Sequence, residues 1–261
     1  MSLSANSLFH FTTLDALKGI LKNGFYSNCS IEQVIFSVDI FPVAIPMVSF
    51  CDIRLTQVQE HISRYGSYGI GLRKEFGVKN GINPIFYLLE NTPPHRLMKR
   101  LISLSFKLNN KETKDSLVLS PDDKINLESL LEIIVFLKLK QGRRWNKSEW
   151  KFYDDVIDFY DEREWRFFPG LRKADNPNLI PLPFIPILET LDYKGGIEFW
   201  DQDNRQFPLM FTNEDLKYLI VKNENDIKHL IDYMKMENIF PEHFESAITK
   251  ITTIDRIKED H

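Results

Sequence analysis

The stretch "DEREWRFFP", residues 161–169, combines a strand pattern with two glutamates separated by one residue. Because side chains alternate between the two faces of a strand, Trp165 and Phe167 are expected on one face. Glu162, Glu164 and Arg166 are expected on the other. The pattern therefore predicts a strand with one charged face. Its carboxylates either pair with Arg166 at a solvated surface or take part in chemistry.

The composition is that of a folded protein without an excess of basic charge. The chain has 261 residues, 43% of them hydrophobic, and a formal net charge of −4. This hydrophobic fraction is sufficient for a sizeable core, so we expect a single α+β domain over residues 1–261. A global basic field, which marks many nucleic-acid binders, is missing.

Cysteine usage and hydropathy indicate a cytoplasmic protein. Cys29 and Cys51 form no CxxC pair and no His/Cys cluster, which argues against a zinc site or a disulfide framework. The N-terminus lacks the basic segment and long apolar run of a signal peptide. The longest apolar run, residues 130–140, is interrupted by charges and is shorter than the ~20 residues that cross a bilayer. We therefore expect no metal site and no membrane partner.

Helix and strand signals alternate along the chain. Thr12 or Thr13 can cap a helix that Gly24 ends, after a short strand at residues 9–12. Residues 95–140 have a helical pattern, which suggests a helical insertion over about 93–148 that is either a cap or part of the core. Gly195 and Gly196 suggest a hairpin turn. Further elements are expected as a strand at 45–51, a helix at 52–66, strands at 68–76 and 85–89, a strand at 217–222, a helix at 223–237 and a strand at 248–254.

A basic and aromatic segment, "KQGRRWNKSEW" at residues 140–150, precedes the two glutamates. Its basic run either contributes to a local groove for nucleic acid or forms a solvated face. Trp145 and Trp150 either stack on a base or anchor a flexible connection.

His10 and Thr12 are candidates for holding a ligand. They would project from the same face of the strand at residues 9–12, where they could hydrogen-bond a pair of ligand hydroxyls such as a ribose diol. A lone histidine beside aromatic residues is, however, more often a packed core residue that donates one ring N–H to a backbone carbonyl. Both interpretations of His10 stay open.

Ser49 and two tyrosines are weaker candidates. Ser49 lies on the predicted strand at residues 45–51, where its hydroxyl can bond to the backbone or to a ligand. The segment "YGSYGIGL", residues 65–72, has glycines that permit close approach of a backbone or a flat ligand, and Tyr65 and Tyr68 can line a pocket. Its glycine spacing fits neither GxxxxGK[ST] nor GxGxxG, so it is not a phosphate-binding loop.

Glu162 and Glu164 would have Cβ atoms roughly 6.5–7 Å apart on one strand face. Two carboxylates that close raise each other's pKa unless cations lie nearby. In a chemical role, Glu164 would stabilise a positively charged, sugar-like transition state and Glu162 would orient or deprotonate the nucleophile. A metal-dependent nuclease is less well supported, since the spaced Asp/His set that it requires is missing.

Three separated stretches together resemble a known family. "LFHFT" at residues 8–12, the block from "IPMVSFC" to "GINPIFY" at residues 45–87, and "DEREWRF" resemble the AbiGi-like family of bacterial proteins linked to abortive phage infection. The resemblance covers most of the chain. AbiGi proteins are described as the antitoxin member of a two-gene system, which implies a cognate toxin or antitoxin protein as partner.

The order of these motifs is also similar, more distantly, to that of ADP-ribosyltransferases. This resemblance implies a split mixed or antiparallel sheet with flanking helices, NAD as a substrate, and a nucleic-acid or protein acceptor. It assigns NAD binding to His10, Thr12, Ser49 and Tyr68, and catalysis to Glu164 with Glu162 as the acceptor-directing partner.

The chain departs from the double-glutamate families of that group. It has His10 where those families have an arginine, and "VSFC" where they have an STS-like motif. The alternative is therefore a non-catalytic antitoxin-type or sensor protein that uses the same fold to bind a partner.

Overall fold

The fold is built on a mixed sheet to which nine of the described strands belong. The computed structural model describes residues 5–36, 39–109, 120, 132–146, 148–170, 185–186 and 193–259. The strand order is β13-β12-β4-β1-β3-β10-β5, and β2 and β11 also pair with β3. The β12–β13 pair is parallel and the remaining pairs of this sheet are antiparallel. The predicted α+β class is confirmed.

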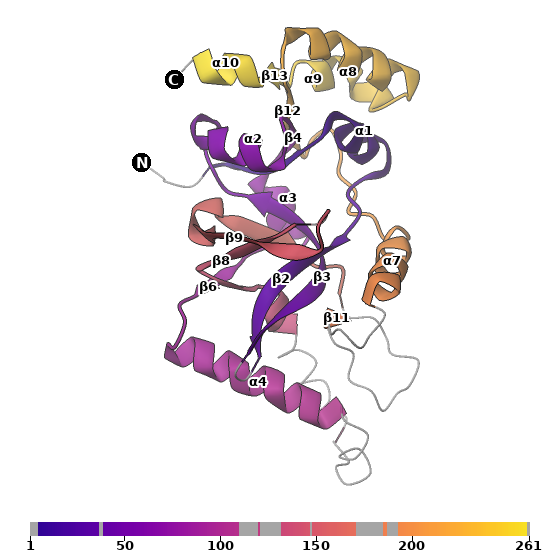
Figure 1. The fold of residues 1–261 in the computed structure, drawn as a ribbon. Coiled ribbons are helices and arrows are strands. Elements are labelled where there is room, and N and C mark those ends of the chain that lie inside the picture. The colour runs from indigo at the N-terminus through magenta and orange to yellow at the C-terminus, as the bar shows by residue number, and fades with distance from the viewer. Residues whose placement is uncertain are drawn as a thin grey trace.

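The elements are distributed over the whole described chain (Figure 1). The strands of the main sheet are β1 (Ser7–Thr12), β2 (Asn28–Phe36), β3 (Asp39–Cys51), β4 (Tyr68–Arg73), β5 (Asn83–Pro84), β10 (Glu164–Phe167), β11 (Ile185–Pro186), β12 (Leu216–Val221) and β13 (Ile251–Thr253). Two further pairs are β6 (Phe86–Leu88) with β7 (Leu137–Leu139), and β8 (Gln141–Asn146) with β9 (Lys151–Asp158). The helices are α1 (Leu14–Asn23), α2 (Gln59–Tyr65), α3 (Lys74–Lys79), α4 (Pro93–Asn109), α7 (Tyr193–Asn204), α8 (Glu224–Met236), α9 (Phe244–Ile248) and α10 (Ile254–Glu259), with 3₁₀ turns η1 (Leu55–Gln57), η2 (Phe159–Glu162) and η3 (Pro241–His243).

Local capping signals fix the ends of two helices. The Thr13 hydroxyl accepts a hydrogen bond from the Ala16 amide at the start of α1, and Gly24 ends that helix with a left-handed φ of 77°. Asn223 accepts hydrogen bonds from two amides of the first turn of α8. Both helices therefore lie where capping rules predict them, because each cap satisfies backbone groups left unpaired at a helix end.

Strand β3 joins the two parts of the sheet. Its first part pairs with β2, from Phe36↔Asp39 to Asn28↔Met47, and its last part pairs with β10, from Phe167↔Val48 to Glu164↔Cys51. β1 meets β3 at one register pair, Phe9↔Cys51, and otherwise runs beside β4. Beyond this pair β1 and β3 separate, and the space between them is where the candidate site lies.

Both faces of β1 are buried, which sets the two sides of the core. Leu8 and Phe50 belong to the larger apolar cluster, together with Leu17 of α1 and Leu230 of α8. Phe9 belongs to a smaller cluster that includes Cys51, Val58 and Ile220. Figure 1 shows α8, α9 and α10 at one end of the molecule beside β12 and β13, with α4 at the opposite end.

The middle of the chain differs from the predicted helical insertion. α4 and residues 132–135 are helical, but residues 137–139 form β7, a strand paired with β6. The segment expected as a flexible connection forms the β8–β9 hairpin. Residues 110–119 and 121–131 of the predicted insertion lie outside the described part of the chain. Helical periodicity failed at residues 137–139 because pairing with β6 overrode it.

The predicted hairpin at Gly195 and Gly196 is also wrong. Both glycines lie in α7, where Ile197 and Trp200 pack against the cluster formed by Cys29, Ile31 and Ala44. Two consecutive glycines weaken a helix, so this packing outweighs their local preference for a turn.

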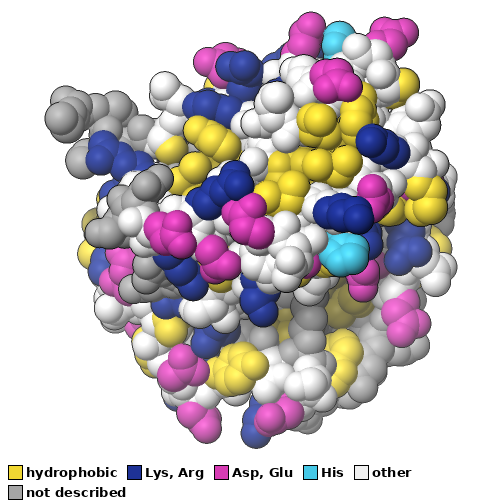
Figure 2. Space-filling view, turned by 90° about the horizontal axis from the view of Figure 1, so that it is seen from above, with side chains coloured by type: hydrophobic (Ala, Val, Ile, Leu, Met, Phe, Trp, Pro, Cys, Tyr) yellow, Lys and Arg dark blue, Asp and Glu magenta, His cyan; other side chains and the backbone are white. Residues whose placement is uncertain are grey.

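The molecule carries mixed charge on the face that Figure 2 shows. Acidic and basic side chains alternate there around a strip of hydrophobic side chains. Within the described ranges, no helix is long and apolar enough to cross a membrane.

Candidate functional site

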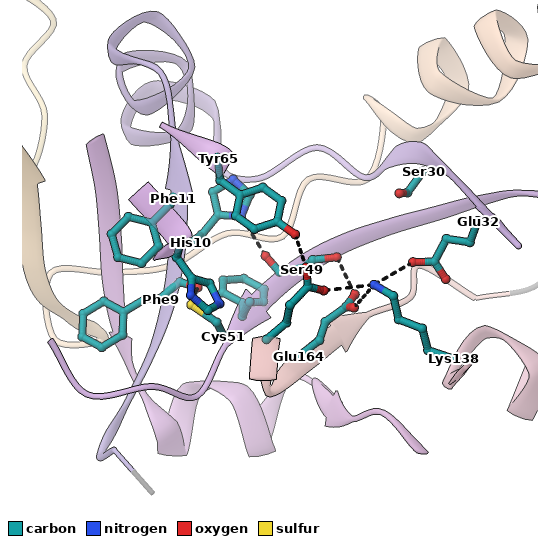
Figure 3. Close-up of a pocket in the computed structure, with 13 residues that line it drawn as sticks. Phe9, His10, Phe11, Ser30, Glu32, Ser49, Cys51, Tyr65, Lys138 and Glu164 are labelled. Atoms are coloured by element: carbon teal, nitrogen blue, oxygen red, sulfur yellow. Dashed lines mark hydrogen bonds and ion pairs between the residues drawn. The ribbon is translucent and has the colours of Figure 1, made fainter. Parts of the chain in front are cut away.

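The candidate site is a cavity of about 150 Å³ at the point where β1 and β3 separate. Five of the candidate residues named from the sequence line it: His10, Ser49, Tyr65, Glu162 and Glu164. Figure 3 shows Ser49 and Glu164 between His10 on one side and Lys138 with Glu32 on the other. Residues far apart in the sequence therefore meet at this cavity.

Glu164 opens β10 and lies at the centre of the site. Its Oε1 accepts hydrogen bonds from Arg166 Nε at 2.6 Å and from the Ser49 hydroxyl at 2.8 Å. Its Oε2 accepts from Lys138 Nζ at 2.8 Å and from Arg166 Nη2 at 3.2 Å. Burial alone would raise the pKa of Glu164, but Arg166 and Lys138 outweigh it and hold the pKa well below its ordinary range. The carboxylate is ionised at neutral pH, and its lone-pair positions are engaged.

Glu162 reaches the cavity from a different element than predicted. It is the last residue of η2, and Arg163 follows it with a left-handed φ of 44° before β10 begins. The prediction that Glu162 and Glu164 alternate along one strand is therefore wrong, because the turn interrupts the two-residue repeat. The Glu162 carboxylate still faces the site, where it accepts hydrogen bonds from the Tyr65 hydroxyl at 2.6 Å and from Lys138 at 3.2 Å.

Lys138 of β7 links three carboxylates. Its Nζ lies 2.8 Å from Glu164, 3.2 Å from Glu162 and 3.3 Å from Glu32. Burial alone would lower the pKa of Lys138, but the three carboxylates outweigh it and raise the pKa well above its ordinary value. Lys138 is therefore a fixed ammonium ion, poorly suited to act as a nucleophile or a base.

Arg166 is fully buried and completes the ion-pair network. Its Nη2 donates to both Glu32 oxygens, at 2.6 Å and 2.8 Å, and its Nη1 donates to the Val135 carbonyl at 2.7 Å. The alternative in which Arg166 neutralises a neighbouring glutamate is confirmed for the ion pair, but that alternative placed the pair at a solvated surface, and the pair is buried. We refer to five residues as the charge cluster: Glu32, Lys138, Glu162, Glu164 and Arg166.

His10 fills the space between the separating strands. Its Nδ1–H donates to the Ser49 carbonyl at 2.8 Å, because a carbonyl can only accept, and its ring packs edge-on against Phe25 and Phe50. Burial lowers the pKa of His10, against the opposing effect of the Ser49 carbonyl, so the ring is neutral at pH 7. His10 thus has the contacts of a packed core histidine, and it also lines the cavity.

Thr12 and Tyr68 do not line this cavity. They face each other across the β1–β4 pair, and the Tyr68 hydroxyl donates to Asp226 of α8 at 3.0 Å. Tyr68 packs against the larger apolar cluster. The two residues are therefore separate from the five candidates that line the cavity.

Two members of the charge cluster were not predicted. Lys138 is one of three charged residues, with Glu132 and Lys140, in the apolar run at residues 130–140. A charge that such a run buries requires a partner, so this signal was available. Glu32 lies in the alternating stretch "CSIEQVIF" and has no local feature that distinguishes it from a surface residue. Its role depends on the pairing of β2 with β3, which is long-range.

The chemistry of the site is electrostatic. Ionised carboxylates can stabilise a developing positive charge, whereas a carboxylate with a lowered pKa is a weak general base. Among the described residues, no group of three or more His, Cys, Asp or Glu side chains is arranged to hold a metal ion. Cys29 and Cys51 are both buried, and they form no disulfide with a described residue.

Comparison with known proteins gives the family. The family model described as "Putative abortive phage resistance protein AbiGi, antitoxin" matches residues 23–222. The chain belongs to the AbiGi family. A relative named "Abortive phage resistance protein AbiGi", from Lactococcus lactis subsp. cremoris, is 29% identical over 229 residues, which cover 83% of this chain and 88% of the relative. No solved structure matches the chain. The region that matches the AbiGi model contains the whole charge cluster, whereas His10 precedes it.

Proposed function

We propose that this AbiGi protein acts in phage defence as an antitoxin-type protein that binds and neutralises a partner toxin. The description of the matching family and the name of the relative both support a defence role. One observation supports a non-catalytic role. Both oxygens of the Glu164 carboxylate already accept hydrogen bonds from Arg166, Lys138 and Ser49. A carboxylate held this way is typical of a structural ion-pair centre.

Co-expression tests the antitoxin role. The toxin candidate is the protein encoded by the adjacent gene, expressed alone or together with this chain in a bacterial host. We expect growth arrest by the adjacent gene product alone and recovery when the chain is present. A complex of the two proteins should also survive size-exclusion chromatography. Continued growth arrest, with the chain present and folded, would argue against the proposal.

NAD-dependent ADP-ribosyl transfer is a second candidate. It is favoured by one observation: His10, Ser49, Glu162 and Glu164 line the same cavity. In this mechanism the bond between nicotinamide and ribose breaks, nicotinamide leaves, and Glu164 stabilises the positive charge that develops on the ribose. The acceptor, a nucleic acid or a protein, then bonds to the ribose carbon and gives its proton to Glu162. An ADP-ribosyltransferase-like fold is part of this second candidate.

The variant Glu164→Gln separates the two candidates. With labelled NAD and a cell lysate, the transfer mechanism predicts labelled product from the wild type and none from Glu164→Gln. The antitoxin mechanism predicts that a folded Glu164→Gln protein still neutralises the toxin. Glu224→Gln is a matched control, because Glu224 forms an exposed ion pair with Arg256. Equal labelling by wild type and Glu164→Gln would exclude transfer through Glu164.

A further inference from the structure

A larger cavity of about 410 Å³ adjoins the site. The two cavities share four lining residues, Ser30, Glu32, Tyr65 and Lys138, so they meet at the charge cluster. The volume is within the range of small-molecule pockets, roughly 300–1,000 Å³. A ligand in the larger cavity would therefore reach the charge cluster at its inner end.

The lining of the larger cavity is basic and aromatic. Arg143, Arg144 and Trp145 come from β8, Tyr153 from β9 and Arg64 from α2. Arg143 is exposed, and its side chain makes no hydrogen bond or ion pair with another described residue. This is the segment in which the sequence places a basic run beside tryptophans. In the structure this segment forms one wall of the cavity as part of the β8–β9 hairpin, instead of the flexible connection that was predicted.

Two buried donors in this wall have no acceptor. The Nε–H of Arg144 and the indole N–H of Trp145 are inaccessible to water and unpaired within the described residues. The Arg144 guanidinium lies over the Tyr153 ring, 5.3 Å from its centroid, and its Nη2 is 3.6 Å from Asp155. Buried N–H groups are normally paired, so these two indicate a missing acceptor. Because both atoms are closed to solvent, a ligand oxygen could bond to them only if this wall shifts on binding.

The inner end of the cavity favours hydroxyl groups. Glu32 Oε1 lies 2.6 Å from Arg166 Nη2 and 3.3 Å from Lys138 Nζ, whereas Oε2 accepts a hydrogen bond from Arg166 at 2.8 Å and from no other described residue. Oε2 therefore retains a lone pair that can accept a hydrogen bond from a ligand. A second carboxylate would be repelled here, so an acidic peptide fits less well than a ligand with hydroxyls at one end and negative charge at the other.

We propose that the larger cavity is a nucleotide-binding site. The phosphates bind at Arg143 and Arg144, the base packs against the aromatic side chains of the β8–β9 wall, and the ribose hydroxyls face Glu32. This inference goes beyond the antitoxin role. It requires no group transfer. A nucleotide bound here would act as a small-molecule regulator of an antitoxin-type protein.

Calorimetric titration with ADP tests the site. We expect one ADP per chain and at least a tenfold loss of affinity in Arg143→Glu, because a repulsive charge replaces a phosphate partner. Arg143 is exposed, so this variant should fold. Arg144→Gln should also weaken binding. Lys228→Glu, a charge reversal at an exposed position of α8, should bind ADP like the wild type. Adenosine and pyrophosphate should each bind at least tenfold more weakly than ADP.

Three results would overturn the inference. They are the absence of ADP binding to wild type at millimolar concentration, equal affinity of wild type and Arg143→Glu, and pyrophosphate binding as tightly as ADP, which would mark a simple anion site. The outcome is independent of the proposed functions, because ADP has no nicotinamide to release. A wild-type protein that neutralises the toxin but does not bind ADP would refute this site and leave the antitoxin role standing.

Discussion

At the scale of single residues, Arg166 is the most consequential side chain of the site. It is fully buried and pairs with Glu164 and Glu32. Removing one partner of a buried ion pair leaves the other charge uncompensated, which typically costs about 3–5 kcal/mol. We therefore expect Arg166→Met to lower the free energy of unfolding by about this amount, measured by urea denaturation followed by circular dichroism.

Arg256→Met is the control for Arg166→Met. Arg256 pairs with Glu224 at the surface, where both side chains are more than half exposed, so its loss should change stability little. A similar midpoint shift in the two variants would show that burial of Arg166 does not govern its contribution.

The lowered pKa of Glu164 makes a second prediction, on the pH dependence of stability. Against the effect of burial, Arg166 and Lys138 hold its folded-state pKa well below the ordinary value of 4.5. The unfolded chain then binds more protons than the folded one below that value, so this contribution is present above about pH 4.5 and is lost as the pH falls. The stability difference between wild type and Glu164→Gln should shrink from pH 5 to pH 3 in urea unfolding, whereas a constant difference would contradict the assignment.

The residues of the site were predicted unevenly from the sequence, for a physical reason. Glu164 and Arg166 follow strand alternation, which depends on neighbouring residues, and both were placed on one face of a strand. Glu162 was assigned to the wrong element because Arg163 adopts a left-handed backbone conformation that no local pattern indicates. Lys138 and Glu32 reach the site through pairing between distant strands. A buried charge cluster requires these long-range contacts, so alternation alone finds only part of it.

At the scale of elements, helix ends were the most predictable features. Thr13, Gly24 and Asn223 act through adjacent backbone groups, and the structure has α1 and α8 where they indicate. Strand β7 was not predictable, because its residues continue the helical pattern before them and its partner β6 lies far back in the sequence. The same limit explains α7, where tertiary packing keeps Gly195 and Gly196 helical.

The junction between α2 and β4 provides an element-scale prediction. Gly66 has a φ of +119°, and a Cβ added there would lie 2.2 Å from the Thr12 carbonyl oxygen. Gly66→Ala must therefore move backbone in β1 or β4, and we expect a loss of at least about 1–3 kcal/mol in urea unfolding. Gly19→Ala in α1 is the matched control, since nothing lies within 4 Å of its Cβ position. It should stabilise the protein by about 0.5–1 kcal/mol. Equal effects would refute the steric account.

At the scale of the whole molecule, the family match and the sheet do not end at the same place. The match ends at residue 222, directly after β12. Strand β13, which pairs with β12, lies after the matched region. Leu230 and Met234 of α8 have no exposed surface and belong to the larger apolar cluster. The segment from residue 223 onward is therefore expected to belong to the same cooperative unit as the site.

A chain ending at residue 222 tests this unity. It would expose the apolar surface that α8 covers and leave one side of β12 unpaired, so we expect it to lose the cooperative unfolding transition of the full chain. Leu230→Ala in the full chain is a milder test and should cost about 2–5 kcal/mol, because it leaves a cavity in the core. Met236→Ala, at an exposed position of the same helix, should have little effect. Cooperative unfolding of the shortened chain would instead mean that residues up to 222 fold as a unit without α8, α9 and α10.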